Sequence, residues 1–135
     1  MTIPPGLLQA FHDTYFNVEG LGTIRIGQPL PALLRAWMER GSVTQISILG
    51  AENPQAVLTS DAENEERHAS LLQECRARGY TIVHVLGQAN TWQERHVLVT
   101  DISRDTAEEF RRRYHQVAVI HATISGTAQL VMDDR

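Results

Sequence analysis

Apolar and polar positions along the chain alternate between the spacing of helices and the spacing of strands. Leu7 and Phe11 recur at a helical interval, whereas Ile24 and Ile26 flank an outward-facing Arg25 as in a half-buried strand. The pattern predicts helices at residues 5–14, 30–41, 60–79 and from 103 onward. It predicts strands at residues 15–18, 21–26, 43–49, 80–86, 96–102, 117–122 and 128–132, with polar loops at 50–60 and 87–95.

The longest continuous signal runs from Val43 to Gly79 and reads as a buried strand, a loop and a long helix. Ser60 and Glu63 have the spacing of a capping box, which satisfies two backbone donors at a helix start. One face of the helix carries Asp61, Asn64, His68, Leu71, Leu72 and Cys75. With the strand that follows, residues 43–86 are predicted to form a right-handed βαβ crossover.

These elements predict a single α/β domain over residues 1–135. The chain is long enough to bury a core without disulfides. We expect a mixed sheet of about six or seven strands with about four helices, arranged as three layers or with one open face. The sequence does not indicate the order of the strands.

Composition narrows the setting and the partners of this domain. The net charge is −4, and all of the basic side chains are arginines, so no basic face is expected and nucleic acid is not a predicted partner. The apolar runs are too short to span a membrane, and the N-terminal stretch lacks the pattern of a secretory signal. One cysteine, Cys75, excludes an internal disulfide. Together these features favour a cytoplasmic protein.

Polar residues in three separate segments are predicted to meet at one edge of the sheet. In sheets with βαβ crossovers, ligands bind beyond the carboxyl ends of the strands, and the loop at 50–60 lies there. If the strand at 97–102 runs parallel to the first, Asp101 approaches the same edge. The amide, guanidinium, indole and carboxylate groups of this set suit a small polar ligand. The predicted ligand-binding residues are Asn53, Glu63, Asn64, Arg67, Trp92, Glu94 and Gln116.

Most of these residues also have a purely structural interpretation. Asn53 precedes a proline, which is typical of a turn, and Glu63 with Arg67 has the spacing of a helix ion pair. His68 is typical of a hydrogen-bonded core histidine. Asn64 faces inward near a helix start, where its polar atoms must find partners, so the structural and the functional interpretation stand equal.

Several kinds of chemistry are disfavoured by the same residues. Acidic side chains occupy the start of the long helix, which disfavours a phosphate there, and no glycine-rich phosphate loop occurs. The acidic residues are Asp61, Glu63, Glu65 and Glu66. No His-Glu-x-x-His motif, cysteine pair or Gly-x-Ser-x-Gly elbow occurs, so neither a metal nor a hydrolase triad is predicted, and no cofactor is expected.

A set of short motifs follows in a fixed order along the chain. They are the IRIGQP segment at 24–29, Asn53-Pro54, Glu63-Asn64 with Arg67, Gly79-Tyr80, Trp92 with Glu94, the strand HVLV, and Gln116 with Ala118. This set resembles a bacterial family known as domain of unknown function 3293, over about residues 15–132. The resemblance implies that these polar positions are family features, and it implies no activity, substrate or cofactor.

The chain departs from the pattern of that family at two positions. The residue before Asn53 is usually aromatic in the family and is Glu52 here, and the small serine that usually follows Glu94 is Arg95 here. Both positions fall in the predicted site, so a ligand shared by the family is expected to be altered in this member.

Two functions are compatible with the sequence, and it indicates no particular reaction. The first is a small-molecule site, binding or enzymatic, at the edge where strands end and the long helix begins. The second is a protein-binding or regulatory module of the immunity type, in which the same polar residues brace loops. The first requires that Trp92 and Glu94 lie near Asn53 and Arg67, whereas the second predicts no concave pocket.

Overall fold

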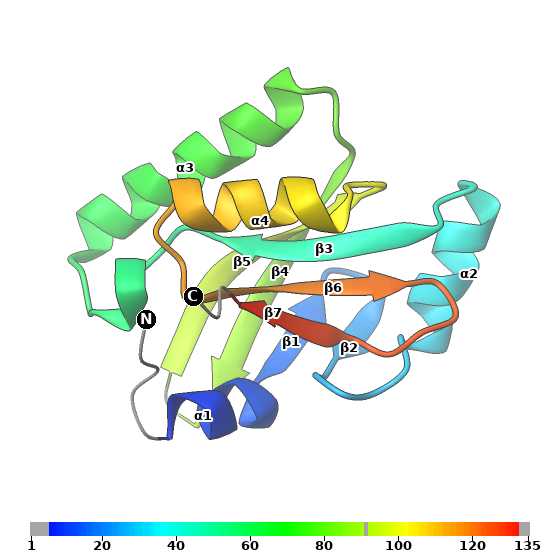
Figure 1. Cartoon of the computed structure of the whole chain (residues 1–135), viewed down its shortest axis with the longest axis horizontal. Helices are drawn as coiled ribbons and strands as arrows, with labels where there is room; N and C mark the ends of the chain where they lie inside the picture. The colour runs from blue at the N-terminus through cyan, green and yellow to red at the C-terminus, as the bar shows by residue number, and fades with distance from the viewer. Residues whose placement is uncertain (1–5, 91, 133–135) are drawn as a thin grey trace.

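The structure, a computed structural model, describes residues 6–90 and 92–132, which form one seven-stranded sheet with helices on both faces (Figure 1). The helical elements are α1 (Leu7–Asp13), α2 (Ala32–Arg40), the short 3-10 helix η1 (Pro54–Ala56), α3 (Asp61–Ala77) and α4 (Arg104–Arg113). The strands are β1 (Tyr15–Val18), β2 (Gly22–Ile24), β3 (Gln45–Gly50), β4 (Ile82–Ala89), β5 (Trp92–Thr100), β6 (Ala118–Thr123) and β7 (Gln129–Met132).

The order of the strands across the sheet is β2-β1-β4-β5-β3-β6-β7. Hairpins join β1 to β2, β4 to β5 and β6 to β7, and the central pair β4–β5 is in register from Ile82 opposite Val99 to Ala89 opposite Trp92. The predicted α/β class, the number of strands and the four α-helices are confirmed.

The expectation of a mixed sheet is wrong, because every ladder between the described strands is antiparallel. The strands β3 and β4 do point the same way and are joined through α3, as the crossover at 43–86 predicts. However, β5 folds back from β4 as a hairpin and lies between the two, so they do not pair with each other.

The direction of β5 also corrects the expected place of Asp101. Because β5 runs antiparallel to β3, its carboxyl end lies at the start of β3, where the backbone N–H of Thr44 donates to Asp101 Oδ1 at 3.1 Å. Asp101 therefore lies at the opposite end of β3 from the loop that follows Gly50.

Two apolar layers hold the helices on the sheet. On one face, Leu34 and Met38 of α2 pack on a cluster that includes Ile48 and Leu98 of the central strands. On the other face, α3 and α4 cover a second cluster of side chains. This second cluster contains Leu49, Ala51, Leu71, Cys75, Val97, Val99, Ile102, Ala107, Phe110, Tyr114, Val119 and Val131. The fold is thus the three-layer alternative of the prediction.

The capping signals of the sequence mark the helix starts correctly. Ser60 and Ser103 each accept a hydrogen bond from the backbone N–H three residues later, at the starts of α3 and α4. In contrast, the predicted loop at 87–95 is wrong, because β4 and β5 extend through it to a tight turn at Asn90. Within the described part of the chain, no helix combines the length and the hydropathy that a bilayer span requires.

Candidate functional site

The strand β5 presents three large polar or aromatic side chains on one face. Trp92, Glu94 and His96 alternate with Gln93 and Arg95, and successive residues of a strand point to opposite faces. All three side chains line a cavity of about 310 Å³ at the end of the sheet where β3 ends and β5 begins. The extension of β5 into the predicted loop therefore creates the site.

Asn53 connects this strand to α3 at the floor of the cavity. Its Nδ2 donates to Glu94 Oε2 at 2.7 Å, and its Oδ1 accepts from Thr59 N at 3.0 Å and from Asn64 Nδ2 at 2.9 Å. Its backbone N–H donates to Asn64 Oδ1 at 2.8 Å. Asn53 adopts a left-handed backbone conformation with φ 47°, which asparagine tolerates better than most residues. The two asparagines therefore fix both the loop and the Glu94 carboxyl.

A second set of hydrogen bonds joins the loop between α4 and β6 to the segment that follows β3. Gln116 Nε2 donates to the carbonyl oxygens of Glu52 and Tyr114, both at 3.1 Å. Arg67 donates from Nε to the Ala51 carbonyl at 2.6 Å and from a terminal nitrogen to the Tyr114 carbonyl at 2.8 Å. Both side chains thus bridge segments that are distant in sequence. Each has more than one N–H donor, and the guanidinium of Arg67 presents its donors as a planar fork.

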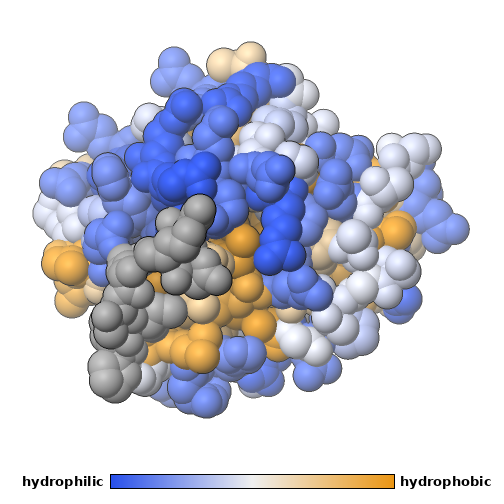
Figure 2. Space-filling view, viewed as in Figure 1, coloured by the Kyte–Doolittle hydropathy of each residue, from blue (hydrophilic) through white to orange (hydrophobic). Residues whose placement is uncertain are grey.

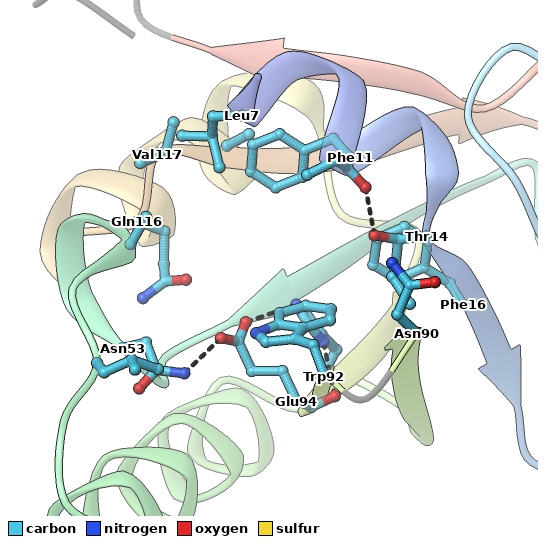
Figure 3. Close-up of a pocket in the computed structure, with 16 residues that line it drawn as sticks. Leu7, Phe11, Thr14, Phe16, Asn53, Asn90, Trp92, Glu94, Gln116 and Val117 are labelled. Atoms are coloured by element: carbon cyan, nitrogen blue, oxygen red, sulfur yellow. Dashed lines mark hydrogen bonds and ion pairs between the residues drawn. The ribbon is translucent and has the colours of Figure 1, made fainter. Parts of the chain in front are cut away.

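The walls of the cavity are largely apolar and come from four parts of the chain. Helix α1 contributes Leu7 and Phe11 above the floor, and β1 contributes Phe16 (Figure 3). The remaining lining residues are Ala10, Thr14, Ala56, Leu58, Ala89, Asn90, Val117 and Ala118. Figure 3 shows Asn53, Glu94 and Gln116 turned toward the space that these walls enclose. An apolar enclosure with a few convergent polar groups is typical of small-molecule sites.

Burial favours the uncharged forms of two titratable side chains at the floor, Glu94 and His96. Burial raises the pKa of Glu94 to about 7, although the bond from Asn53 opposes this, and the nearby charge of Glu52 raises the pKa further. Burial also lowers the pKa of His96 to about 4, against a raising effect of its bond to the Glu94 carbonyl, and the charge of His68 adds to the lowering. At neutral pH the floor therefore carries a neutral imidazole and a partly protonated carboxyl.

Two glycines make room for His96. A Cβ atom at Gly50 on β3 would stand 2.9 Å from His96 Cδ2, and one at Gly87 on β4 would stand 3.2 Å from His96 Cε1. The edge of the imidazole meets Phe16, with 5.5 Å between ring centroids and an interplanar angle of 85°. The ring consequently lies in a recess that a Cβ atom at position 50 would obstruct and one at position 87 would tighten.

The structure brings four of the seven predicted ligand-binding residues to one cavity, namely Asn53, Trp92, Glu94 and Gln116. Asn64 lies directly behind them in hydrogen bonds with Asn53. The other two, Glu63 and Arg67, do not line this cavity.

Their places on α3 explain why. Glu63 is exposed on the first turn, where its backbone N–H donates to Ser60 Oγ at 3.2 Å. In the described residues no ion pair joins Glu63 to Arg67, whose guanidinium bonds to backbone carbonyls instead. His68 is buried as predicted, but within the described structure its Nδ1 has no hydrogen-bond partner.

Sequence reasoning missed His96 and the α1 residues. The alternation of Trp92, Glu94 and His96 was a usable signal for one strand face, but the assignment of residues 87–95 to a loop concealed it. No local signal could place Leu7 and Phe11, because α1 reaches the cavity only through the tertiary fold.

The fold and the cavity define a small α/β domain with an antiparallel sheet and a cavity with a polar floor at one end of that sheet. The chain belongs to the family described as "Protein of unknown function (DUF3293)", whose model matches residues 49–119. No curated protein and no solved structure matches the chain. The matched residues include the whole polar floor, from Asn53 to Gln116, and leave out α1.

Proposed function

We propose that the cavity binds a compact organic ligand, neutral or cationic, that carries a flat apolar portion and a hydrogen-bonding group. The observation that carries this proposal is the buried Glu94 carboxyl, fixed by Asn53 at the base of an apolar enclosure that includes Trp92. We further propose that the protein works in the bacterial cytosol. The buried free thiol of Cys75 supports this setting, because such a thiol suits a reducing compartment.

The lining explains the preferred charge and shape of the ligand. Among the described residues around the cavity none is an arginine, and the His96 imidazole is neutral at pH 7, so an anion would find no cationic partner. Glu94 and Gln116 present acceptor oxygens, which suit a ligand that donates hydrogen bonds. The indole of Trp92 and the ring of Phe11 suit a flat apolar group. Anionic nucleotides are therefore disfavoured.

The test compares three probes that share one ring and differ in charge: benzylamine, benzyl alcohol and benzoate. The chain contains two tryptophans, so a Trp37→Phe background makes Trp92 the only indole and its fluorescence a reporter of the cavity. We expect saturable changes with benzylamine and benzyl alcohol and none with benzoate. A ligand that binds only the folded state also raises the melting temperature.

Two variants separate a ligand contact from a structural one. Asn53→Gly keeps the left-handed backbone accessible but removes the side chain that fixes Glu94, so it is expected to weaken binding. Glu65→Gln removes an exposed carboxylate of α3 and is expected to leave binding unchanged. Equal affinity for all three probes, or no binding of any, contradicts the proposal.

Protein binding is the second candidate function, and one observation favours it. Leu58 is 83% exposed and Val57 is 63% exposed, and both follow η1 at the rim of the cavity. Hydrophobic side chains also reach the surface in the middle of the face shown in Figure 2. Exposed apolar groups of this kind occur in protein interfaces. Affinity capture with wild type and Leu58→Ser tests this, and a partner recovered equally by both proteins counts against it.

A further inference from the structure

Glu94 and His96 form an acid–base pair inside the cavity. Glu94 Oε1 lies 3.4 Å from His96 Nε2, and the two side chains are only 10% and 12% exposed. The other carboxyl oxygen, Oε2, accepts from Asn53 Nδ2, which orients the carboxyl so that Oε1 faces the imidazole.

The backbone fixes the tautomer of the imidazole. His96 Nδ1 lies 3.1 Å from the carbonyl oxygen of Glu94, and a carbonyl only accepts hydrogen bonds, so Nδ1 carries the proton. The neutral ring then presents the lone pair of Nε2 toward Glu94 Oε1. The recess between Gly50 and Gly87 holds the ring in this orientation. The floor thus places a proton donor and a proton acceptor side by side.

We propose that Glu94 and His96 catalyse a 1,3-proton shift, such as enolisation, in a neutral ligand held beneath Trp92. This inference rests on the proposed ligand site and assigns it a chemical class. The protonated carboxyl gives its proton from Oε1 to a carbonyl oxygen of the ligand, while Nε2 of His96 takes a proton from the carbon next to that carbonyl. The ketone becomes an enol, and the floor becomes a carboxylate beside an imidazolium.

The pair then resets without any other reactant. The imidazolium returns its proton from Nε2 to the carboxylate at Oε1, across the same short distance. Only bonds to hydrogen form and break, and no electrons leave the ligand, so the step needs neither an oxidant nor a cofactor. The chemistry suits neutral ring compounds with an acidic C–H next to a carbonyl or imine. The carboxyl, whose pKa of about 7 lies near the working pH, is matched to the role of general acid, and the imidazole, neutral at that pH, has its Nε2 lone pair free to accept a proton.

The experiment uses 1-phenylpropan-2-one, a neutral ketone with a ring and acidic benzylic hydrogens, in deuterated buffer. Enolisation replaces these hydrogens by deuterium, and proton NMR follows the loss of their signal. We expect the wild-type protein to accelerate the exchange over buffer, with Glu65→Gln equal to wild type. General acid–base catalysis typically contributes about 100-fold or more, so Glu94→Gln and His96→Asn are expected to lose about that factor.

Two further measurements separate this inference from the binding proposal. Trp92 fluorescence in the Trp37→Phe background shows whether the ketone binds, and binding without accelerated exchange overturns the inference while the ligand site stands. Nitrogen NMR of the ligand-free protein shows which ring nitrogen of His96 carries the proton. A proton on Nε2 at neutral pH, or full exchange activity in Glu94→Gln, also overturns the inference. Absence of both binding and exchange overturns the ligand site itself.

Discussion

Replacement of Glu94 by glutamine tests the electrostatic description of the cavity floor in the absence of any ligand. Glutamine has nearly the shape of a protonated glutamic acid. Its oxygen can accept from Asn53 Nδ2 as Oε2 does now, and its amide nitrogen takes the place of Oε1, which lies 3.4 Å from His96 Nε2. The variant therefore keeps the hydrogen bond to Asn53 and removes the titration of the carboxyl.

The magnitude follows from the pKa of Glu94. Burial raises it from the ordinary 4.5 to about 7. The folded state thus binds a proton more tightly than the unfolded state, and this contribution to stability is fully present below pH 4.5 and is lost as the pH rises through 7. At about 1.4 kcal/mol for each pKa unit, the wild type loses roughly 3 kcal/mol relative to Glu94→Gln across this range.

Urea unfolding followed by circular dichroism at pH 5, 6, 7 and 8 measures this difference. The stability of the variant relative to the wild type should rise with pH and level off above pH 7, by about 2.5 kcal/mol in total between pH 5 and pH 8, because part of the change lies below pH 5. His96 titrates in both proteins, so its own pH dependence largely cancels in the comparison. Glu65→Gln, an exposed carboxylate of α3, provides the matched control and should show no such rise.

A difference between wild type and Glu94→Gln that stays the same from pH 5 to pH 8 would refute the reasoning. It would mean that Glu94 ionises at its ordinary pKa, and that the floor holds a carboxylate rather than an acid. A wild type that gains on the variant with rising pH would refute it more strongly, because the ionised form would then be the stabilised one.

Three further predictions concern the supports of the site. Gly50→Ala should cost about 1–3 kcal/mol of stability by overpacking and should displace the imidazole of His96. Gly41→Ala, whose Cβ would meet nothing closer than 3.6 Å, should be nearly neutral, and thermal unfolding of both variants measures the difference. Arg67→Lys should cost about 2 kcal/mol in urea unfolding, because a single ammonium cannot reach both carbonyls that the guanidinium bridges, and the exposed Arg76→Lys should cost nothing measurable. His68→Leu should raise stability by about 1 kcal/mol, because it removes a buried nitrogen that has no hydrogen-bond partner among the described residues. Burial also lowers the pKa of His68, so the gain in stability should grow below pH 6.5, and a loss of stability at every pH would contradict the prediction.

Local signals in the sequence were sufficient for the elements that carry them. Ser60 accepts the hydrogen bond from Glu63 N that the capping box predicts, and the inward face of α3 buries Asn64, His68, Leu71 and Cys75 as its periodicity indicates. The sequence also predicted correctly that the buried amide of Asn64 needs hydrogen-bond partners, and Asn53 supplies them. Capping and helical periodicity are short-range properties, so one chain segment suffices to reveal them.

The cavity depends instead on how distant segments pair, which the local pattern does not encode. Polar residues such as Gln93 and Glu94 suggest a loop, yet β4 and β5 continue through this stretch because each strand supplies the other with hydrogen-bond partners. The same hairpin places β5 between β3 and β4 and so makes the sheet antiparallel. The antiparallel pairing of β5 with β3 and β4 therefore explains three wrong predictions: the mixed sheet, the loop at 87–95 and the position of Asp101.

The pairing of β5 also brings together the two residues at which the chain is expected to depart from the family pattern. Glu52 and Arg95 are partners, with Arg95 Nε donating to Glu52 Oε2 at 2.5 Å, and the Glu52 side chain is only 6% exposed. A buried carboxylate without a cation is costly, so glutamate at one position calls for arginine at the other. Because Arg95 points to the opposite face of β5 from Glu94 and His96, neither departure lines the cavity. Both residues thus lie behind the floor, and the charge of Glu52 raises the pKa of Glu94 from there, so the expectation that they alter the ligand stays a prediction.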